Sequence, residues 1–289
     1  MSAVQRVAAG SAVQVAVDAL HLDGAVVVEG LLAPEAIACI ERELEPHVQE
    51  RAPGFRPGFD QAFYGGNTKR IQALVAKSPT FASAVLVHPV LLGICDEILG
   101  ASCGNYWLSQ AETIFIGPSE PAQVLHRDDE NWSFAQRLGI PLQVSVLVAL
   151  GNFDEETGAT RVLPRSHQWD LDEPFDRSVE VGVSLQPGDA LIYLGSTVHG
   201  GGANTTSDSW RRALYAGFLV GWLTPEESVA LSIPENVLRG LPERARALVG
   251  WSSLDGNRAC STDGSQAALG LWQMDSDVLK RHGGLFSNR

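Results

Sequence analysis

The chain has 289 residues, of which 45% are hydrophobic and 19% charged, a composition that suits a globular protein with a sizeable core. Its 34 acidic residues outnumber its 21 Lys and Arg, so the formal net charge is −13 at pH 7. Nucleic acids and anionic membranes are bound through clustered Lys and Arg, and no basic run occurs here. We therefore expect no nucleic acid or membrane partner, and a small-molecule substrate instead.

The cysteines and the N-terminal residues indicate in which cellular compartment the protein is expected. No C-x-x-C pair occurs, and the cysteines are too sparse for a disulfide scaffold: Cys39, Cys95, Cys103 and Cys260. Reduced thiols and a cytoplasmic location are the expectation. The first 20 residues lack a long apolar core before a small-residue cleavage site, and no apolar run reaches 18 residues. The sequence therefore predicts neither a secretion signal nor a transmembrane helix.

The N-terminal part is predicted to form a helical cover over about 12–103. Apolar spacing favours a helix from Ala12 to Leu20, followed by a Gly turn and a β-branched strand. A second helix is predicted to begin at Pro34, because apolar residues recur at helical spacing: Ile37, Ile40 and Leu44. Residues 54–74 are rich in Gly, Pro and aromatics and resemble a functional loop. Ser78 is predicted to cap the first of two short helices that follow.

From residue 104 the pattern changes to short β-like runs separated by Gly, Pro and acidic turns. The runs are "NYWLSQAETIFIG", "AQVLHRDD", "PLQVSVLVALGNF", "ATRVLPRSH", "VSLQPGDALIYLG" and "WRRALYAGFLVGWL". Strands at this spacing favour a sandwich or jelly roll over alternating βαβ units. We predict a mainly β fold with flanking helices, whose core over about 104–223 is a double-stranded β-helix (jelly roll, cupin-like). Helices and a lid are expected over about 224–289, and one domain over 1–289.

Two histidines and an acid indicate a metal site. The stretch "QVLHRDDENW" contains an H-x-D at His126 and Asp128, a spacing that one expects about once by chance among 7 His and 34 acids. A second one, "HLD" at 21–23, is interpreted as a helix-to-strand turn. On a strand, His126 and Asp128 would face the same side, and His199 is the third candidate. Two His and one carboxylate form the facial triad of non-haem Fe(II) oxygenases, whereas zinc with the same ligands would serve hydrolysis.

Arg211, at the head of a strand-like run, favours the oxygenase. If this strand alternates, Arg211 shares a face with Ala213 and Tyr215, small or polar residues that leave space beside the metal. A guanidinium in a barrel interior needs a carboxylate and binds one bidentately. The C5 carboxylate of 2-oxoglutarate would fit. Arg212 is assigned to the opposite face, although the sequence leaves open the reverse assignment.

These motifs together resemble a known family. The order H-x-D, "ETGATRVLPRSH", "PGD", H-G-x-G-x-N and R-R, over about 14–223, resembles that of the phytanoyl-CoA dioxygenase family of Fe(II)- and 2-oxoglutarate-dependent oxygenases. The wording is most similar to the branch that acts on terpenoid and alkaloid natural products and includes verruculogen synthase. The resemblance implies that His126, Asp128 and His199 hold Fe(II), that Arg211 binds the distal carboxylate of 2-oxoglutarate, and that Thr160 adds a hydroxyl hydrogen bond.

One residue departs from the family pattern, and several others are weaker candidates. Arg165 stands where the family usually has Gly in a P-G-S-H turn, which puts the shape of that loop in question. Gln110 and Gln123 could each reach the keto-acid carboxylate, with a surface or sheet-edge glutamine as the other interpretation. Three residues could line the substrate pocket or simply pack: Tyr64, Thr68 and Trp132.

The resemblance implies oxidation of a substrate coupled to the conversion of 2-oxoglutarate and O₂ to succinate and CO₂. We expect hydroxylation, desaturation or rearrangement of a small, largely apolar metabolite in natural-product biosynthesis. An acyl-CoA hydroxylase is an alternative, since four basic residues could form a positive pocket mouth: Lys69, Arg70, Arg161 and Arg165. A cupin-type metal-dependent hydrolase or isomerase, or a small-molecule binding barrel, is another. The resemblance implies a homodimer, which the tail "HGGLFSNR" neither favours nor excludes.

Overall fold

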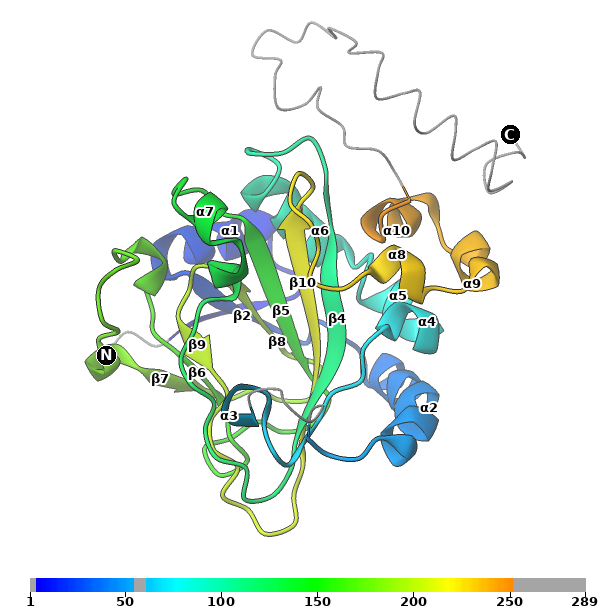
Figure 1. Ribbon diagram of the computed structural model, residues 1–289, viewed down its shortest axis with the longest axis horizontal. Helices are drawn as coiled ribbons and strands as arrows, with labels where there is room; N and C mark the ends of the chain where they lie inside the picture. Colours follow the sequence, from blue (N-terminus) through cyan, green and yellow to red (C-terminus); the bar gives the residue numbers. More distant parts are fainter. Residues whose placement is uncertain (1–3, 55–60, 252–289) are drawn as a thin grey trace, which may run out of the picture.

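The computed structural model describes residues 4–54 and 61–251, which form a large sheet, a small sheet and a set of helices (Figure 1). The strands are β1 (Gln5–Ala8), β2 (Ala25–Glu29), β3 (Thr68–Lys69), β4 (Tyr106–Ile116), β5 (Gln143–Ala149), β6 (Thr160–Val162), β7 (Val181–Val183), β8 (Ala190–Leu194), β9 (His199–Gly200) and β10 (Arg211–Val220). The α-helices are α1 (Val13–Asp23), α2 (Pro34–Glu50), α3 (Gln61–Tyr64), α4 (Leu74–Lys77), α5 (Pro79–Ala84), α6 (Pro89–Ile98), α7 (Ser133–Gln136), α8 (Val229–Ser232), α9 (Glu235–Gly240) and α10 (Glu243–Leu248). The 3-10 helices are η1 (Asp128–Trp132), η2 (Ser166–Gln168) and η3 (Arg177–Val179). No helix in this part of the chain combines the length and the apolarity needed to cross a bilayer.

The two sheets bring together strands that are far apart in the sequence. The large sheet has the order β1-β2-β8-β5-β10-β4-β3, and the small sheet has the order β7-β6-β9. All pairings are antiparallel except that of β1 with β2. The strands predicted beyond residue 104 are confirmed in most cases. The prediction of a mainly β chain is too simple, because helices cover one whole face of the large sheet and the fold is mixed α/β (Figure 1).

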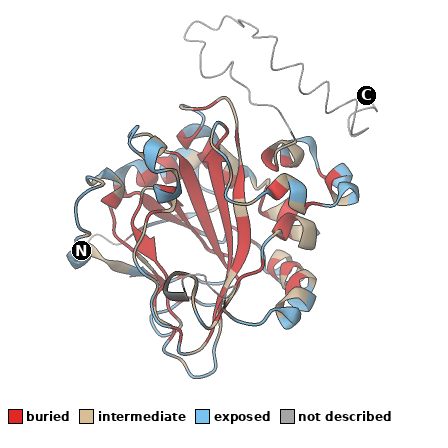
Figure 2. Cartoon of the chain, in the orientation of Figure 1, coloured by how far each residue is buried: buried red, intermediate tan, exposed pale blue. Residues whose placement is uncertain are grey.

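Strand β10 shows how the sheet separates two cores. Leu214 and Phe218 pack into the large cluster beneath the helices, whereas Ala213 and Tyr215 belong to a second cluster on the other face. This is the two-residue period of a strand whose faces are both covered. Figure 2 shows the resulting pattern, with the central strands of the large sheet buried and exposed residues mostly on the outer sides of the helices and in loops. The face with Tyr215 is the one that looks toward the small sheet.

The predicted N-terminal helices are confirmed. Helix α1 ends at Gly24, which has a φ of 77° and serves as its left-handed C-cap, so that the chain turns into β2. Helix α2 begins at Pro34 and buries the predicted apolar residues: Ile37, Ile40 and Leu44. Strand β1 was not predicted from the sequence. Its four residues bury little of their own surface, and only its parallel pairing with β2 identifies it.

The segment that contains the H-x-D motif is not a strand, which corrects the expectation for "AQVLHRDD". His126 forms an isolated antiparallel bridge with His199, and Asp128 begins η1. At this turn the Arg127 amide donates to the Glu130 carboxylate at 3.3 Å. Strand alternation is therefore not what brings His126 and Asp128 to the same side. A bridge followed immediately by a helical turn produces the same result.

Arg165 adopts the conformation for which glycine is favoured. Its φ is 69° and its ψ is 1°, in the left-handed region that L-residues with a Cβ seldom occupy. The backbone amide of Arg165 donates to the Asp23 carbonyl at 2.8 Å, and its side-chain Nε donates to the Asp23 carboxylate at 3.2 Å. The loop thus keeps the shape that a glycine would give it, and the contacts to the end of α1 offset the strain.

The C-terminal prediction is confirmed in part. Helices α8 and α10 lie in the two segments predicted to be helical, and α9 lies between them. The expected lid, with His282 and Cys260, lies at 252–289, outside the described residues. A single domain over 1–289 stays a prediction.

We expect Ser78→Ala to destabilise the protein by about 1–2 kcal/mol, the usual effect of removing a helix N-cap. The buried Ser78 hydroxyl accepts from the Phe81 amide at 2.9 Å at the start of α5, and it also bonds to the Glu43 carboxylate. Urea unfolding measures the difference. Ser83→Ala is the matched control, because Ser83 is exposed on the same helix and caps nothing. Equal unfolding midpoints for the two variants would contradict the assignment.

Candidate active site

A cavity of about 390 Å³ lies on the face of the large sheet that looks toward the small sheet. Its wall includes side chains from β4, β5, β8 and β10 of the large sheet and from β6 and β9 of the small one. The rest comes from α3, from Arg70, from the segment before and within η1, and from Gly201 and Glu226. This volume is in the range of small-molecule sites, and the site lies where a barrel-like pair of sheets opens.

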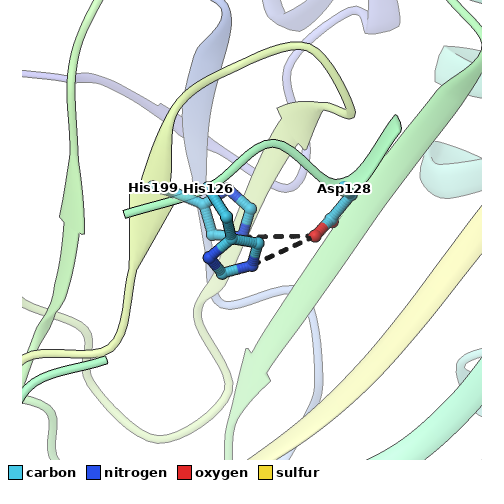
Figure 3. A group of neighbouring side chains, drawn as sticks. All are labelled: His126, Asp128 and His199. Atoms are coloured by element: carbon cyan, nitrogen blue, oxygen red, sulfur yellow. Dashed lines mark ion pairs between the residues drawn. The ribbon is translucent and has the colours of Figure 1, made fainter. Parts of the chain in front are cut away.

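His126, Asp128 and His199 meet on this wall (Figure 3). Each offers one ligand atom, and the three atoms lie within 4.8 Å of one another. The Nε2 atoms of His126 and His199 are each 3.5 Å from Oδ1 of Asp128. Neighbouring ligand atoms of an octahedral ion with bonds of about 2.1 Å are about 3 Å apart, so the spacing is close to that of one face of an octahedron. No other such group occurs within 4–54 and 61–251.

The backbone explains how the distant histidines meet. The amide of His126 donates to the carbonyl of His199, and the amide of His199 donates to the carbonyl of His126, each at 3.0 Å. This is the hydrogen-bonded pair of an antiparallel ladder, in which residues directly opposite have side chains on the same face. The ring centroids are 4.4 Å apart as a result.

Both imidazoles are held in the form that binds a metal through Nε2. The Nδ1 atom of His126 lies 3.0 Å from the carbonyl of Val124, and the Nδ1 atom of His199 lies 3.0 Å from the carbonyl of Thr197. A carbonyl only accepts, so Nδ1 carries the proton and Nε2 keeps a free lone pair. Burial lowers the pKa of His199 to about 4, with Asp128 acting in the opposite direction. The His199 ring is therefore neutral at physiological pH.

The second carboxylate oxygen of Asp128 is already occupied. Its Oδ2 accepts from the Ser145 hydroxyl at 2.6 Å and from the Tyr215 hydroxyl at 3.0 Å. Burial alone would raise the pKa of Asp128, but His199, His126 and Ser145 outweigh it and hold that pKa well below its usual range. Asp128 is thus ionised, with Oδ1 left to face the two imidazoles.

Arg211 lies in the same cavity without an acidic partner. Its side chain is 2% exposed, and its Nη1 donates to the Gly158 carbonyl at 2.7 Å, with the Thr160 hydroxyl at 3.4 Å. Among the described residues no carboxylate pairs with Arg211, and its buried Nε has no hydrogen-bond partner. Burial, followed by the charge of Arg70, lowers the pKa of Arg211 to about 9, so the guanidinium is still charged at neutral pH. A buried cation with unused donors fits a bound carboxylate.

The structure also decides between the two arginines at the head of β10. Arg211 lines the cavity together with Tyr215, in agreement with the predicted alternation. Arg212 points to the helix side, where it pairs with Glu41 of α2 at 2.8 Å. The assignment of Arg211 to the interior face is confirmed.

The weaker candidates fall into two groups. Gln110, Gln123 and Tyr64 line the cavity, but both amides have protein partners. The Gln110 amide donates to the Glu112 carboxylate at 3.0 Å, and the Gln123 carbonyl accepts from the Gly201 amide at 3.1 Å. Each amide would have to give up or share that bond to reach a keto acid.

Thr68 and Trp132 are not among the cavity-lining residues, which does not support the expectation that they form the substrate pocket. The Thr68 hydroxyl lies 3.3 Å from the Glu120 carboxylate, and the Trp132 indole donates to the Thr224 carbonyl at 3.0 Å. These contacts connect β3 and η1 to neighbouring segments. Both elements are very short, so sequence spacing does not reveal which way their side chains point.

Several site residues were missed by the sequence analysis. Phe63 packs edge-on against the His126 ring at 4.7 Å, and the Tyr193 ring lies 4.3 Å from that of His199. Ser145 bonds to the metal-facing carboxylate from the middle of β5. A signal for Ser145 was present, since it is a hydroxyl in the centre of the fully buried run "QVSVLVA", and buried polar groups need a partner.

Comparison with known proteins places this geometry in a family. The model described as phytanoyl-CoA dioxygenase (PhyH) matches residues 20–213. The chain belongs to the phytanoyl-CoA dioxygenase family. It is accordingly a 2-oxoglutarate-dependent dioxygenase that uses Fe(II), and the residues that form the cavity described above fall largely within the matched region.

Fungal dioxygenases are similar along most of the chain. Dioxygenase aneA of Aspergillus aculeatus is 32% identical over 296 residues, which covers 100% of this chain and 96% of aneA. Dioxygenase trt7 of Aspergillus terreus is 33% identical over 260 residues, which covers 89% of this chain and 90% of trt7. These matches support membership of the PhyH family and a relationship to fungal dioxygenases in general. They do not single out verruculogen synthase.

Solved structures share the fold at low sequence identity. The non-haem α-ketoglutarate-dependent epimerase SnoN from nogalamycin biosynthesis is 20% identical, with a TM-score of 0.57 over 72% of this chain and 80% of SnoN. HygX from Streptomyces hygroscopicus, solved with nickel, 2-oxoglutarate and hygromycin B, is 17% identical, with a TM-score of 0.56 over 73% of this chain and 89% of HygX. This likeness supports the predicted double-stranded β-helix core.

Proposed function

We propose that this dioxygenase holds Fe(II) with His126, Asp128 and His199 and binds the distal carboxylate of 2-oxoglutarate with Arg211 and Thr160. The observation that carries the proposal is the presence, in one cavity, of three converging metal-ligand atoms and a buried guanidinium without an acidic partner among the described residues. A dicarboxylate with one end on the metal and the other on the guanidinium satisfies both at once.

With Fe(II) bound, the site supplies the activation of O₂, and 2-oxoglutarate leaves as succinate and CO₂ while the substrate is oxidised. The protein provides the positions. His126 and His199 present neutral Nε2 atoms, because their Nδ1 protons are held by backbone carbonyls. Asp128 presents one oxygen, because its other oxygen is held by Ser145 and Tyr215. Arg211 would orient the co-substrate through its carboxylate.

Other functions that use the same three ligands leave some of the observed contacts unexplained. A zinc hydrolase on this scaffold would leave the unpartnered charge of Arg211 without a role. A binding barrel would need neither the fixed imidazoles nor the occupied second oxygen of Asp128. Halogenation is disfavoured as well, since the carboxylate of Asp128 stands where a halide would need a free position on the metal.

The substrate that we propose is a small natural-product metabolite. Fungal dioxygenase relatives support this, as do structural neighbours from nogalamycin biosynthesis and a hygromycin B complex. The cavity wall includes Gln110, Glu112 and Asn131 beside Ile114 and Leu147. We therefore expect hydrogen-bonding groups on the metabolite in addition to an apolar skeleton, which modifies the largely apolar ligand expected from the sequence.

An acyl-CoA substrate has less support in the structure. The basic residues that could have formed a phosphate-binding mouth are all engaged within the protein: Arg70 with Glu112, Arg161 with Glu180, Arg165 with Asp23, and Lys69 with the Val48 carbonyl. A CoA phosphate would have to compete with these contacts. The net charge of −13 adds a general repulsion for such an anion.

The function is tested by adding Fe(II) and then 2-oxoglutarate to metal-free protein under anaerobic conditions. A weak visible charge-transfer band should appear only when both are present, because it arises from a keto acid chelated to Fe(II). Zn(II) is the matched control, since its filled d-shell gives no such band with the same ligands. Folded, iron-loaded protein without a band would contradict the proposal and favour the hydrolase or the binding barrel.

A further inference from the structure

Three polar side chains stand behind Asp128, on the strands that form the cavity wall. Gln143 and Ser145 lie on β5, and Tyr215 lies on the neighbouring β10. The amide nitrogen of Gln143 is 3.0 Å from the Ser145 hydroxyl and 2.8 Å from the Tyr215 hydroxyl. Both hydroxyls contact Oδ2 of Asp128, at 2.6 Å and 3.0 Å. All three side chains are buried, and Gln143 and Ser145 are fully so.

The direction of these hydrogen bonds follows from the chemistry of the groups. An ionised carboxylate can only accept, so the Ser145 and Tyr215 hydroxyls both donate to Asp128. Each hydroxyl oxygen keeps lone pairs that can accept, and the amide group of Gln143 has two N–H protons, one for each. The 3.2 Å approach between the two hydroxyl oxygens uses no proton, because both protons are directed at the carboxylate.

With its nitrogen turned toward the two hydroxyls, the Gln143 side-chain amide leaves its own carbonyl oxygen, which is buried, without a hydrogen-bond partner within the described residues. Turning the amide over would give this oxygen two hydroxyl donors, but it would draw their protons away from Asp128. An unsatisfied buried acceptor is unfavourable, and the two hydrogen bonds to the Asp128 carboxylate offset this cost.

We propose that Gln143 is a positioning residue that directs the protons of Ser145 and Tyr215 onto one oxygen of Asp128 and thereby keeps Asp128 a one-oxygen metal ligand. The inference rests on the proposed function, in which Asp128 binds Fe(II). A carboxylate with both oxygens free can chelate and fill an additional coordination position. Holding Oδ2 leaves that position to 2-oxoglutarate and O₂, and it fixes the direction in which Oδ1 points.

Three variants test this: Gln143→Met, Ser145→Ala and Tyr215→Phe. Each removes a donor with little change of volume. We expect each to weaken anaerobic Fe(II) binding by about 10- to 100-fold, the usual effect of losing a group that orients a metal ligand. The charge-transfer band with 2-oxoglutarate should shift or lose intensity, since the freed carboxylate competes for the position of the keto acid. Gln143→Met should produce both changes although it does not touch Asp128.

Tyr106→Phe is the matched control. Tyr106 is a buried tyrosine whose hydroxyl donates to another carboxylate, that of Asp96, at 2.9 Å, and it does not line the cavity. Its loss should leave Fe(II) affinity and the band unchanged, even where the thermal unfolding of the metal-free protein changes.

The outcomes separate the two proposals. Wild-type protein that binds no Fe(II) would refute the proposed function. Wild-type protein that binds Fe(II), with Gln143→Met and Tyr215→Phe folded and equal to it in affinity and spectrum, would refute the positioning role alone. The three polar groups would then serve only to stabilise the pairing of β5 and β10.

Discussion

Fe(II) binding should weaken by more than about 100-fold in His199→Ala, beyond the 10- to 100-fold effect of losing a group that merely supports a metal ligand. His199 is buried, its Nε2 is free, and it is the ligand candidate on β9, paired directly with His126 through the backbone. Alanine leaves that pairing intact but removes one of three ligand atoms. Anaerobic titration with Fe(II) measures the loss, and O₂-dependent conversion of 2-oxoglutarate to succinate should fall to background.

The control for His199→Ala is His47→Ala. His47 lies in the last turn of α2 and is not part of the cavity. Its replacement should change neither Fe(II) affinity nor succinate formation. If the His199→Ala protein has normal secondary structure and binds Fe(II) as tightly as wild type, the metal lies elsewhere.

The second large effect is expected in Arg211→Ala, whose KM for 2-oxoglutarate should rise by about 100-fold or more. Removing one partner of a buried ion pair costs about 3–5 kcal/mol, and each 1.4 kcal/mol is about tenfold in affinity. Fe(II) binding in the absence of 2-oxoglutarate should be unchanged, because Arg211 holds no metal-ligand atom. The KM of Arg211→Lys for 2-oxoglutarate should lie between those of wild type and Arg211→Ala, since a lysine keeps the charge but lacks the planar pair of donors.

Arg212→Ala is a stringent control for Arg211→Ala, because the two residues are adjacent and carry the same charge. Arg212 faces the helices and pairs with Glu41, with 43% of its side chain exposed. A pair that is this exposed contributes about 1 kcal/mol or less, and its loss should not alter the KM for 2-oxoglutarate. If the two alanine variants had the same KM, the assignment of the carboxylate site would be wrong.

The parts of the site that could be predicted are those that depend on residue chemistry and strand period. His126, Asp128, His199 and Arg211 were identified because few chemistries need those side chains in that order, and because alternation placed Arg211 rather than Arg212 inside. Asp128 was predicted to face His126 because of strand alternation, which is the wrong local reason. The residue begins a 3-10 helix and not a strand, and both conformations direct its carboxylate toward His126.

The parts that could not be predicted depend on tertiary contacts. Thr68 lies on the two-residue strand β3 and Trp132 ends η1, elements too short for sequence spacing to show which way a side chain points. Gln143 acts through two hydroxyls, one of them on another strand, and only the register of β5 against β10 reveals it. A homodimer and a cytoplasmic location stay predictions, because neither depends on the fold of one chain.

The cavity wall consists of strands, which are constrained by their neighbours, and of loops, which are not. Arg211, Tyr215 and Ser145 belong to a seven-stranded ladder that is buried on both faces, where a change in one strand disturbs its neighbours. Across the cavity, the strands of the small sheet have two or three residues each, and loops supply the rest of the wall. Loops tolerate insertion and substitution. New substrates can therefore be accommodated by remodelling the loops that hold no ligand atom, while Arg211, Thr160 and His199 keep their places on β10, β6 and β9.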